Sequence, residues 1–155
     1  MKLLKELPSP VLLFSLFLGL FIGPVDGAEK TPQSVQVTIR TILAANKVDD
    51  FDPKLKGMEQ QLKSLKYRSY HSLKDESKTV AWQGSQAFEI PGGRMLTVAP
   101  QDFQDNRIAL KVRLTQGDKP VVDTTVKIPN KGNFILGGPP HEGGVLVLSI
   151  SAAAQ

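Results

Sequence analysis

From residue 67 onward the sequence is a succession of short runs rich in β-branched and aromatic residues, separated by residues that favour turns. Pro91-Gly92-Gly93, Gln116-Gly117-Asp118 and Pro129-Asn130-Lys131-Gly132 are typical of hairpin turns. Runs of this length and spacing indicate antiparallel strands. The runs are YRSYHSLKD, SKTVAWQ, QAFEI, RMLTVAP, RIALKVRLT, PVVDTTVKI, NFILG and GVLVLSIS. They predict a mainly β (α+β) fold, an antiparallel β-sandwich or partly open barrel.

One strand and one helix precede these runs. Val35, Val37, Ile39 and Thr41 alternate with polar residues, which predicts a half-buried first strand. Asp52 before Pro53 is a helix start, because the carboxylate can accept from a free amide and proline presets the first helical φ. Leu55, Met58, Leu62 and Leu65 then follow at helical spacing. We therefore expect an amphipathic helix at about 53–66, within a single domain spanning 35–155.

The amino-terminal segment has the order of a secretory signal peptide. Lys2 and Lys5 precede the 12-residue apolar run Val11 to Ile22, and small residues follow it. The run is too short to span a hydrocarbon core, which takes roughly 20 residues. We expect cleavage after Gly27, with residues 1–27 the signal peptide and 28–34 a flexible leader. The sequence thus predicts a protein that is periplasmic or secreted.

The 155-residue chain contains no cysteine. Disulfide frameworks, thiolate metal sites and thiol nucleophiles are thereby excluded. The predicted signal peptide carries two basic and two acidic residues, so its removal leaves the net charge at +4. A basic chain suggests an acidic partner. Nucleic acid is not expected as that partner, since aromatic residues make up only 6% of the chain and stacking platforms need several.

The excess positive charge lies in one stretch, from Lys54 to Lys78, which holds seven basic and three acidic residues. On a helical wheel Lys56, Gln60 and Lys63 point away from the leucine face. These observations predict a surface that docks an envelope protein or another anionic surface. An ordinary solvated face is the alternative explanation of the same pattern. The predicted partner-binding residues are Lys56, Gln60, Lys63, Arg68, Tyr70 and Lys74.

Residues that could carry catalysis or bind metal are few. His71 falls within a predicted strand, where a structural role is common, and His141 with Glu142 supplies too few ligands for zinc. The aspartates at 49, 50 and 52 lack the glycine and distal glutamate of a calcium loop. We expect no metal, no cofactor and no catalytic residue.

Residues 123–151 resemble a stretch of the secretin domain of bacterial outer-membrane secretion channels. The matching features are Thr124-Thr125-Val126, Gly132, Phe134 to Gly138, and the aliphatic strand Val145 to Ile150. The chain lacks the membrane-lip segment and the repeated amino-terminal domains of that family, so the resemblance does not imply a pore.

The mature chain also resembles small exported bacterial proteins of unknown function. They share a D-P-x-L helix start, a strand like K-Y-x-S-Y, a P-G-G-R turn and a terminal G-G-P with G-G-V-L. The corresponding positions are Asp52 to Leu55, Lys66 to Tyr70, Pro91 to Arg94, Gly137 to Pro139 and Gly143 to Leu146. This resemblance implies an accessory envelope role and no catalytic activity.

The sequence therefore favours a non-enzymatic exported envelope protein that docks another envelope or secretion-system component. Docking could use the basic surface, or an exposed strand edge that a partner extends. The alternative is a small glycan-binding or glycan-acting periplasmic domain that uses Trp82, Tyr70 and a carboxylate such as Glu89.

Overall fold

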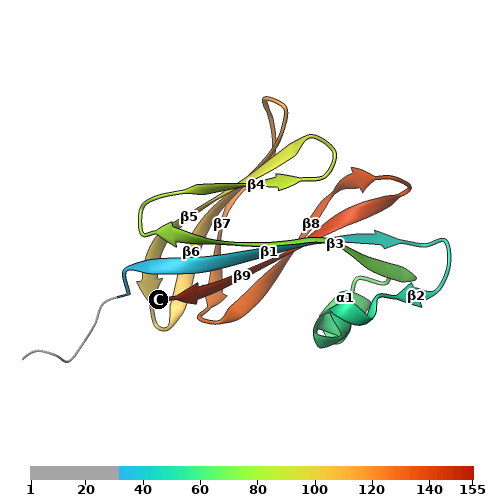
Figure 1. Cartoon of the computed structure of the whole chain (residues 1–155), viewed down its shortest axis with the longest axis horizontal. Helices are drawn as coiled ribbons and strands as arrows, with labels where there is room; N and C mark the ends of the chain where they lie inside the picture. Colours follow the sequence, from blue (N-terminus) through green and yellow to red (C-terminus); the bar gives the residue numbers. More distant parts are fainter. Residues whose placement is uncertain (1–31) are drawn as a thin grey trace, which may run out of the picture. The chain divides into compact units, whose positions relative to one another are not determined.

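A computed structural model describes residues 32–155, so the predicted signal peptide and the first part of the leader lie outside the described residues. Two sheets dominate it, as Figure 1 shows, and all their strand pairs are antiparallel except the short parallel pair of β2 and β3. The prediction of a mainly β fold with one helix is confirmed. The first sheet has the order β2-β3-β1-β9-β8 and the second the order β4-β5-β6-β7. The strands are β1 (Ser34–Ala45), β2 (Asp50–Phe51), β3 (Ser69–Ala81), β4 (Gln86–Ile90), β5 (Arg94–Gln104), β6 (Arg107–Gln116), β7 (Lys119–Pro129), β8 (Gly132–His141) and β9 (Gly144–Ala154).

The three predicted turns connect β4 to β5, β6 to β7 and β7 to β8. A fourth tight turn, at Asp105 and Asn106, joins β5 to β6 with φ values of 54° and 59°. Asp and Asn tolerate this left-handed backbone better than other non-glycine residues do, and both central residues of a type I′ hairpin require it. The two runs on either side of Glu76 form one continuous strand, β3, instead of two.

The main core lies between the two sheets. Strand β1 contributes Val35, Val37 and Ile39 to it, and β9 contributes alternate residues from Leu146 to Ala152. The second sheet contributes apolar residues from all four of its strands to the same core. This alternation is what a sheet with one buried face requires.

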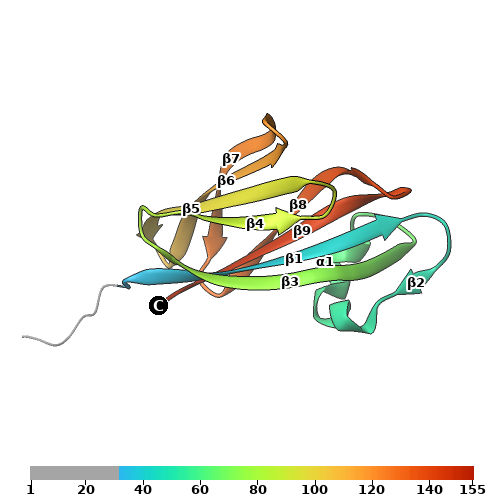
Figure 2. The ribbon, with the colours of Figure 1, turned by 45° about the horizontal axis from the view of Figure 1, so that its top comes forward.

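The first sheet is covered on its other face only at one end. There Ile42 and Ala44 of β1 and Val147 of β9 join Leu55 and Leu62 in a second buried cluster. Figures 1 and 2 both place the short helix at this end, beneath the last residues of β1. The β1 run ILAA is apolar on both faces for this reason, whereas its first half alternates.

The predicted helix at 53–66 is shorter than expected and only partly α-helical. A 3₁₀ segment η2 (Pro53–Met58) leads into a single α-turn, α1 (Glu59–Lys63). Asp52 caps the start by accepting from the Lys54 amide, as predicted. Leu65 is 38% exposed and lies beyond the helix end, and Lys66 takes a positive φ of 66° that terminates it.

The seam between β3 and β4 has no strand pairing and is bridged by lysines. Lys74 of β3 donates to the Glu89 carbonyl of β4 at 3.2 Å, and Lys78 donates to the Ala87 carbonyl. The Lys78 ammonium also lies 5.0 Å from the centre of the Phe88 ring. Lysines that occupy the carbonyls of an edge strand protect it from pairing with another chain.

Candidate functional site

The six predicted partner-binding residues do not form one surface. Tyr70 is only 1% exposed and belongs to the cluster beneath the helix, so its assignment to an exposed surface is wrong. Its hydroxyl donates to the Leu62 carbonyl and accepts from the Tyr67 amide at 3.0 Å. Lys74 projects toward β4 instead, on the side of the first sheet that faces the main core. Lys56 and Gln60 are exposed on the helical segment.

Lys63 and Arg68 do come together, in a hollow of about 650 Å³ that we call the Arg68 hollow. Its remaining lining consists of Asp49, Asp50, Phe51, Tyr67 and the edge of Tyr70. The rings of Phe51 and Tyr67 each meet the Tyr70 ring edge to face, with centroids 5.8 and 6.3 Å away. Buried Tyr70 thus positions two half-exposed aromatic rings at the floor of a charged depression.

Both cations of the Arg68 hollow have acidic neighbours. Arg68 Nε lies 3.0 Å from Asp49 Oδ1, and Lys63 Nζ lies 2.6 Å from Glu59 Oε2. The Arg68 guanidinium lowers the pKa of Asp49 through a hydrogen bond and its charge, and Asp49 raises the pKa of Arg68 in return. The hollow therefore presents paired charges of both signs beside aromatic faces, not a uniformly positive field.

The local charge excess is also smaller than the sequence window suggested. Three aspartates just before Lys54 fold against the same region: Asp49 on Arg68, Asp50 on His71 at 3.2 Å, and Asp52 on the Lys54 and Ser72 amides. When they are included, residues 49–78 hold seven basic and six acidic residues. These contacts give each of the three aspartates a partner within the protein, so their clustering is explained without a bound cation.

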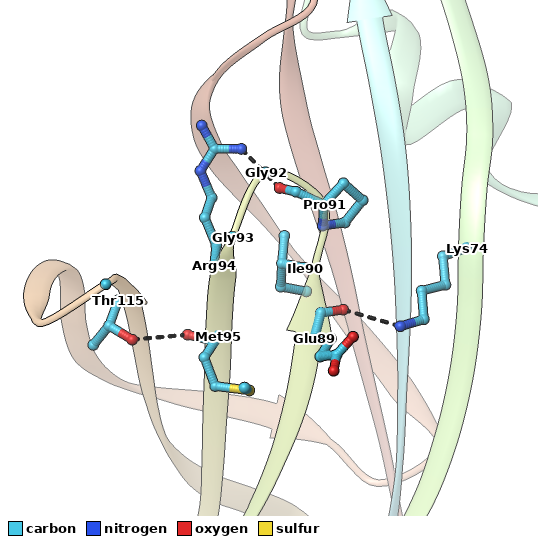
Figure 3. Close-up of a pocket in the computed structure, with 10 residues that line it drawn as sticks. Lys74, Glu89, Ile90, Pro91, Gly92, Gly93, Arg94, Met95 and Thr115 are labelled. Carbon is cyan, nitrogen blue, oxygen red and sulfur yellow. Dashed lines mark hydrogen bonds between the residues drawn. The ribbon is translucent and has the colours of Figure 1, made fainter.

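A second hollow, of about 570 Å³, lies at the β4–β5 turn and was not predicted from the sequence. Figure 3 shows Lys74 reaching it from β3, with Ile90, Pro91, Met95 and Thr115 around it. We call it the Arg94 hollow after the arginine in its lining, whose side chain is 8% exposed.

Arg94 joins two glycine-containing segments that are far apart in the sequence. Its Nη1 donates to the Pro91 carbonyl at 2.8 Å, and its Nη2 donates to the Pro140 carbonyl at 3.0 Å. Nη1 also lies 3.4 Å from His141 Nδ1. Gly92 must be glycine here, because a Cβ at its φ of 92° would lie 2.4 Å from Nη1. The P-G-G-R and G-G-P motifs were visible in the sequence, but nothing local indicates that they meet.

The predicted glycan platform does not assemble. Trp82 packs on Phe103 at the main core with ring centroids 6.1 Å apart, Tyr70 is buried beneath the helix, and Glu89 lines the Arg94 hollow. Within residues 32–155, no three His, Asp or Glu side chains are grouped so that they could hold a metal ion. His141 Nε2 instead lies 3.0 Å from Glu142 Oε2.

Across the described residues, no helix combines the length and apolarity that crossing a membrane demands. Comparisons of the sequence with protein-family models and with curated proteins, and of the fold with solved structures, find no match. The resemblances to the secretin hairpin and to small exported proteins therefore stay predictions.

Proposed function

We propose that the protein is an exported, non-enzymatic binding module that docks another envelope component at the Arg68 hollow. The observation that carries this proposal is the convergence of Lys63 and Arg68 with Phe51 and Tyr67 in one open depression. Aromatic residues are enriched among the side chains that contribute most to protein–protein affinity.

The paired charges decide what kind of partner fits. Because Asp49 already neutralises Arg68, a partner that offered only negative charge would have to displace an existing ion pair. A protein segment that supplies an apolar or aromatic side chain to the floor, with polar groups of both signs at the rim, matches the hollow better. Both cations are more than half exposed, so they set orientation and association rate more than affinity.

The proposal is tested with Phe51→Ala and Arg68→Glu, each compared with Lys111→Glu on the exposed face of β6 in the second sheet. Each variant is expressed in the native host, and the protein is recovered after chemical crosslinking of the envelope. Recovery of the crosslinked partner should fall strongly for the two hollow variants and stay unchanged for Lys111→Glu. Equal recovery from all three would reject the Arg68 hollow as the docking site.

A further inference from the structure

Strand β7 forms a free edge of the second sheet, since it pairs with β6 alone. The opposite edge of this sheet is protected by Lys74 and Lys78, whose ammonium groups occupy β4 carbonyls. The edge strand β8 of the first sheet carries Pro139 and Pro140, which have no amide to donate. Residues 121–128 of β7 carry neither kind of protection within the described chain, so their backbone is open to an added strand.

The outward-facing backbone groups of β7 follow from the hairpin turn between β5 and β6. Gln104 and Arg107 close this two-residue turn as a hydrogen-bonded pair, so Arg107 directs its amide and carbonyl toward β5. The next residue, Ile108, therefore directs its own toward β7, where it lies opposite Ile128. Because successive residues of a strand alternate in this direction, the residues whose backbone groups face away from β6 are Asp123, Thr125 and Lys127.

The two prolines on either side of β6 agree with this assignment. Pro100 lies opposite Leu110, and its carbonyl accepts from the Gln83 amide instead of bonding to β6, as the same alternation requires. Pro129 belongs to the outward-facing set of β7, which is where an edge strand accommodates a residue without an amide. Within residues 32–155, the outward backbone groups at 123, 125 and 127 have no hydrogen-bond partner.

The charges on this edge select one partner strand and one register. Asp123 and Lys127 are exposed, and neither has an ion-pair partner among residues 32–155. If a second β7 pairs antiparallel about a twofold axis at Thr125, Asp123 of each copy lies opposite Lys127 of the other. An axis at Asp123 or at Lys127 would place like charges opposite each other, which is unfavourable, and an axis at 124 or 126 would oppose no charges.

We infer that the protein forms a symmetric dimer in which two β7 edges pair antiparallel about Thr125 and join the second sheets of both copies. Such an interface uses the same surface of each copy, so both ion pairs form twice over by symmetry. The inner face of β7 also gains from the pairing. Val122 is only partly buried in one copy, and this register places it beside the core residue Ile128 of the other.

The inference is independent of the proposed docking function, because β7 contributes no residue to the Arg68 hollow. Its test is sedimentation equilibrium of the protein purified from its native host, up to millimolar concentration. The parent should approach twice the mass of one chain. Asp123→Lys or Lys127→Asp alone should weaken association by about tenfold or more, since each turns two attractive pairs into repulsive ones. Asp118→Lys, in the exposed β6–β7 turn outside the paired segment, is the matched control and should behave as the parent.

An equimolar mixture of the Asp123→Lys and Lys127→Asp proteins decides the register. One chain then carries two lysines on its edge and the other two aspartates, so the mixture should recover the mass of a dimer although neither variant does so alone. Recovery also shows that both variants are folded. A parent that stays monomeric, single variants that associate like the parent, or a mixture that stays monomeric would overturn the inference.

A single introduced thiol tests the twofold axis itself. The chain has no cysteine, and hydrogen-bonded residues of an antiparallel pair have Cα atoms about 5.5 Å apart, a distance that a disulfide spans. Thr125→Cys should therefore give a disulfide-linked dimer on mild oxidation, whereas Thr97→Cys on β5 of the same sheet should not. Equal crosslinking of the two variants, or none from Thr125→Cys, would contradict the proposed axis.

Discussion

The hydroxyl of Tyr70 donates to the carbonyl of Leu62 and thereby ties the end of α1 to the first sheet. The same oxygen accepts from the Tyr67 amide, so one side chain satisfies two backbone groups in the connection between helix and strand. This relationship holds the floor of the Arg68 hollow, and it explains why a tyrosine at position 70 is buried instead of exposed.

Tyr70→Phe should lower the free energy of unfolding by about 1–2 kcal/mol, because it leaves the Tyr67 amide without its acceptor and removes one of the donors to the Leu62 carbonyl, which keeps the Leu65 amide. Tyr67→Phe is the matched control. Within residues 32–155 no hydrogen bond involves the Tyr67 hydroxyl, and the ring is partly exposed, so a change within about 0.5 kcal/mol is expected. Urea denaturation measures both values, and equal losses would contradict the structural role given to Tyr70.

Two glycines near the β8–β9 turn, Gly137 and Gly144, differ in the space available for a side chain. A Cβ at Gly144 would lie 2.3 Å from the Ala44 carbonyl oxygen of β1, whereas a Cβ at Gly137 meets no atom within 4 Å. Gly144→Ala should therefore cost about 2 kcal/mol, since backbone must move apart. Gly137→Ala should be neutral or slightly stabilising. Thermal unfolding of the two variants tests this, and a similar loss in both would contradict the packing around Gly144.

Asp52 makes stability depend on pH. Hydrogen bonds from the Lys54 and Ser72 amides lower the pKa of its carboxyl below the ordinary value of 3.8. A carboxylate with a lowered folded-state pKa stabilises the protein above its unfolded pKa, and this contribution is lost as the pH falls through the folded value.

Asp52→Asn should therefore be less stable than the parent at pH 7, and the difference should shrink as the pH is lowered below about 4. Denaturation curves between pH 7 and pH 3 measure it. A difference that stays constant over this range would show that the charge of Asp52 is unimportant.

Much of the fold follows from local sequence. Alternation predicts β1, and the turn at 91–93 and the hairpin residues at 117–118 and 130–131 lie between strands as expected. Asp52 was also predicted correctly as a helix cap. These features depend on residues close in the chain, where turn chemistry and periodicity act directly.

The parts that could not be predicted depend on contacts between distant residues. The charge window began at Lys54 and so excluded the aspartates that fold back on Arg68 and His71. Alternation along the strand that begins at Tyr67 did not reveal that Tyr70 packs against Leu55 and Leu62, because this contact depends on how the helical segment packs on the first sheet. The Arg94 hollow requires β4–β5 and β8–β9 turns to meet, which only the sheet order determines.

The most direct test of the docking proposal is photo-crosslinking in living cells from position 67. A benzophenone amino acid replaces Tyr67 in the Arg68 hollow, and a matched protein carries it at Thr97 of β5, in the second sheet. The account predicts one dominant adduct from position 67, its loss when Arg68→Glu is added, and no such adduct from position 97. An adduct of the same size from both positions, or one that persists with Arg68→Glu, would contradict it.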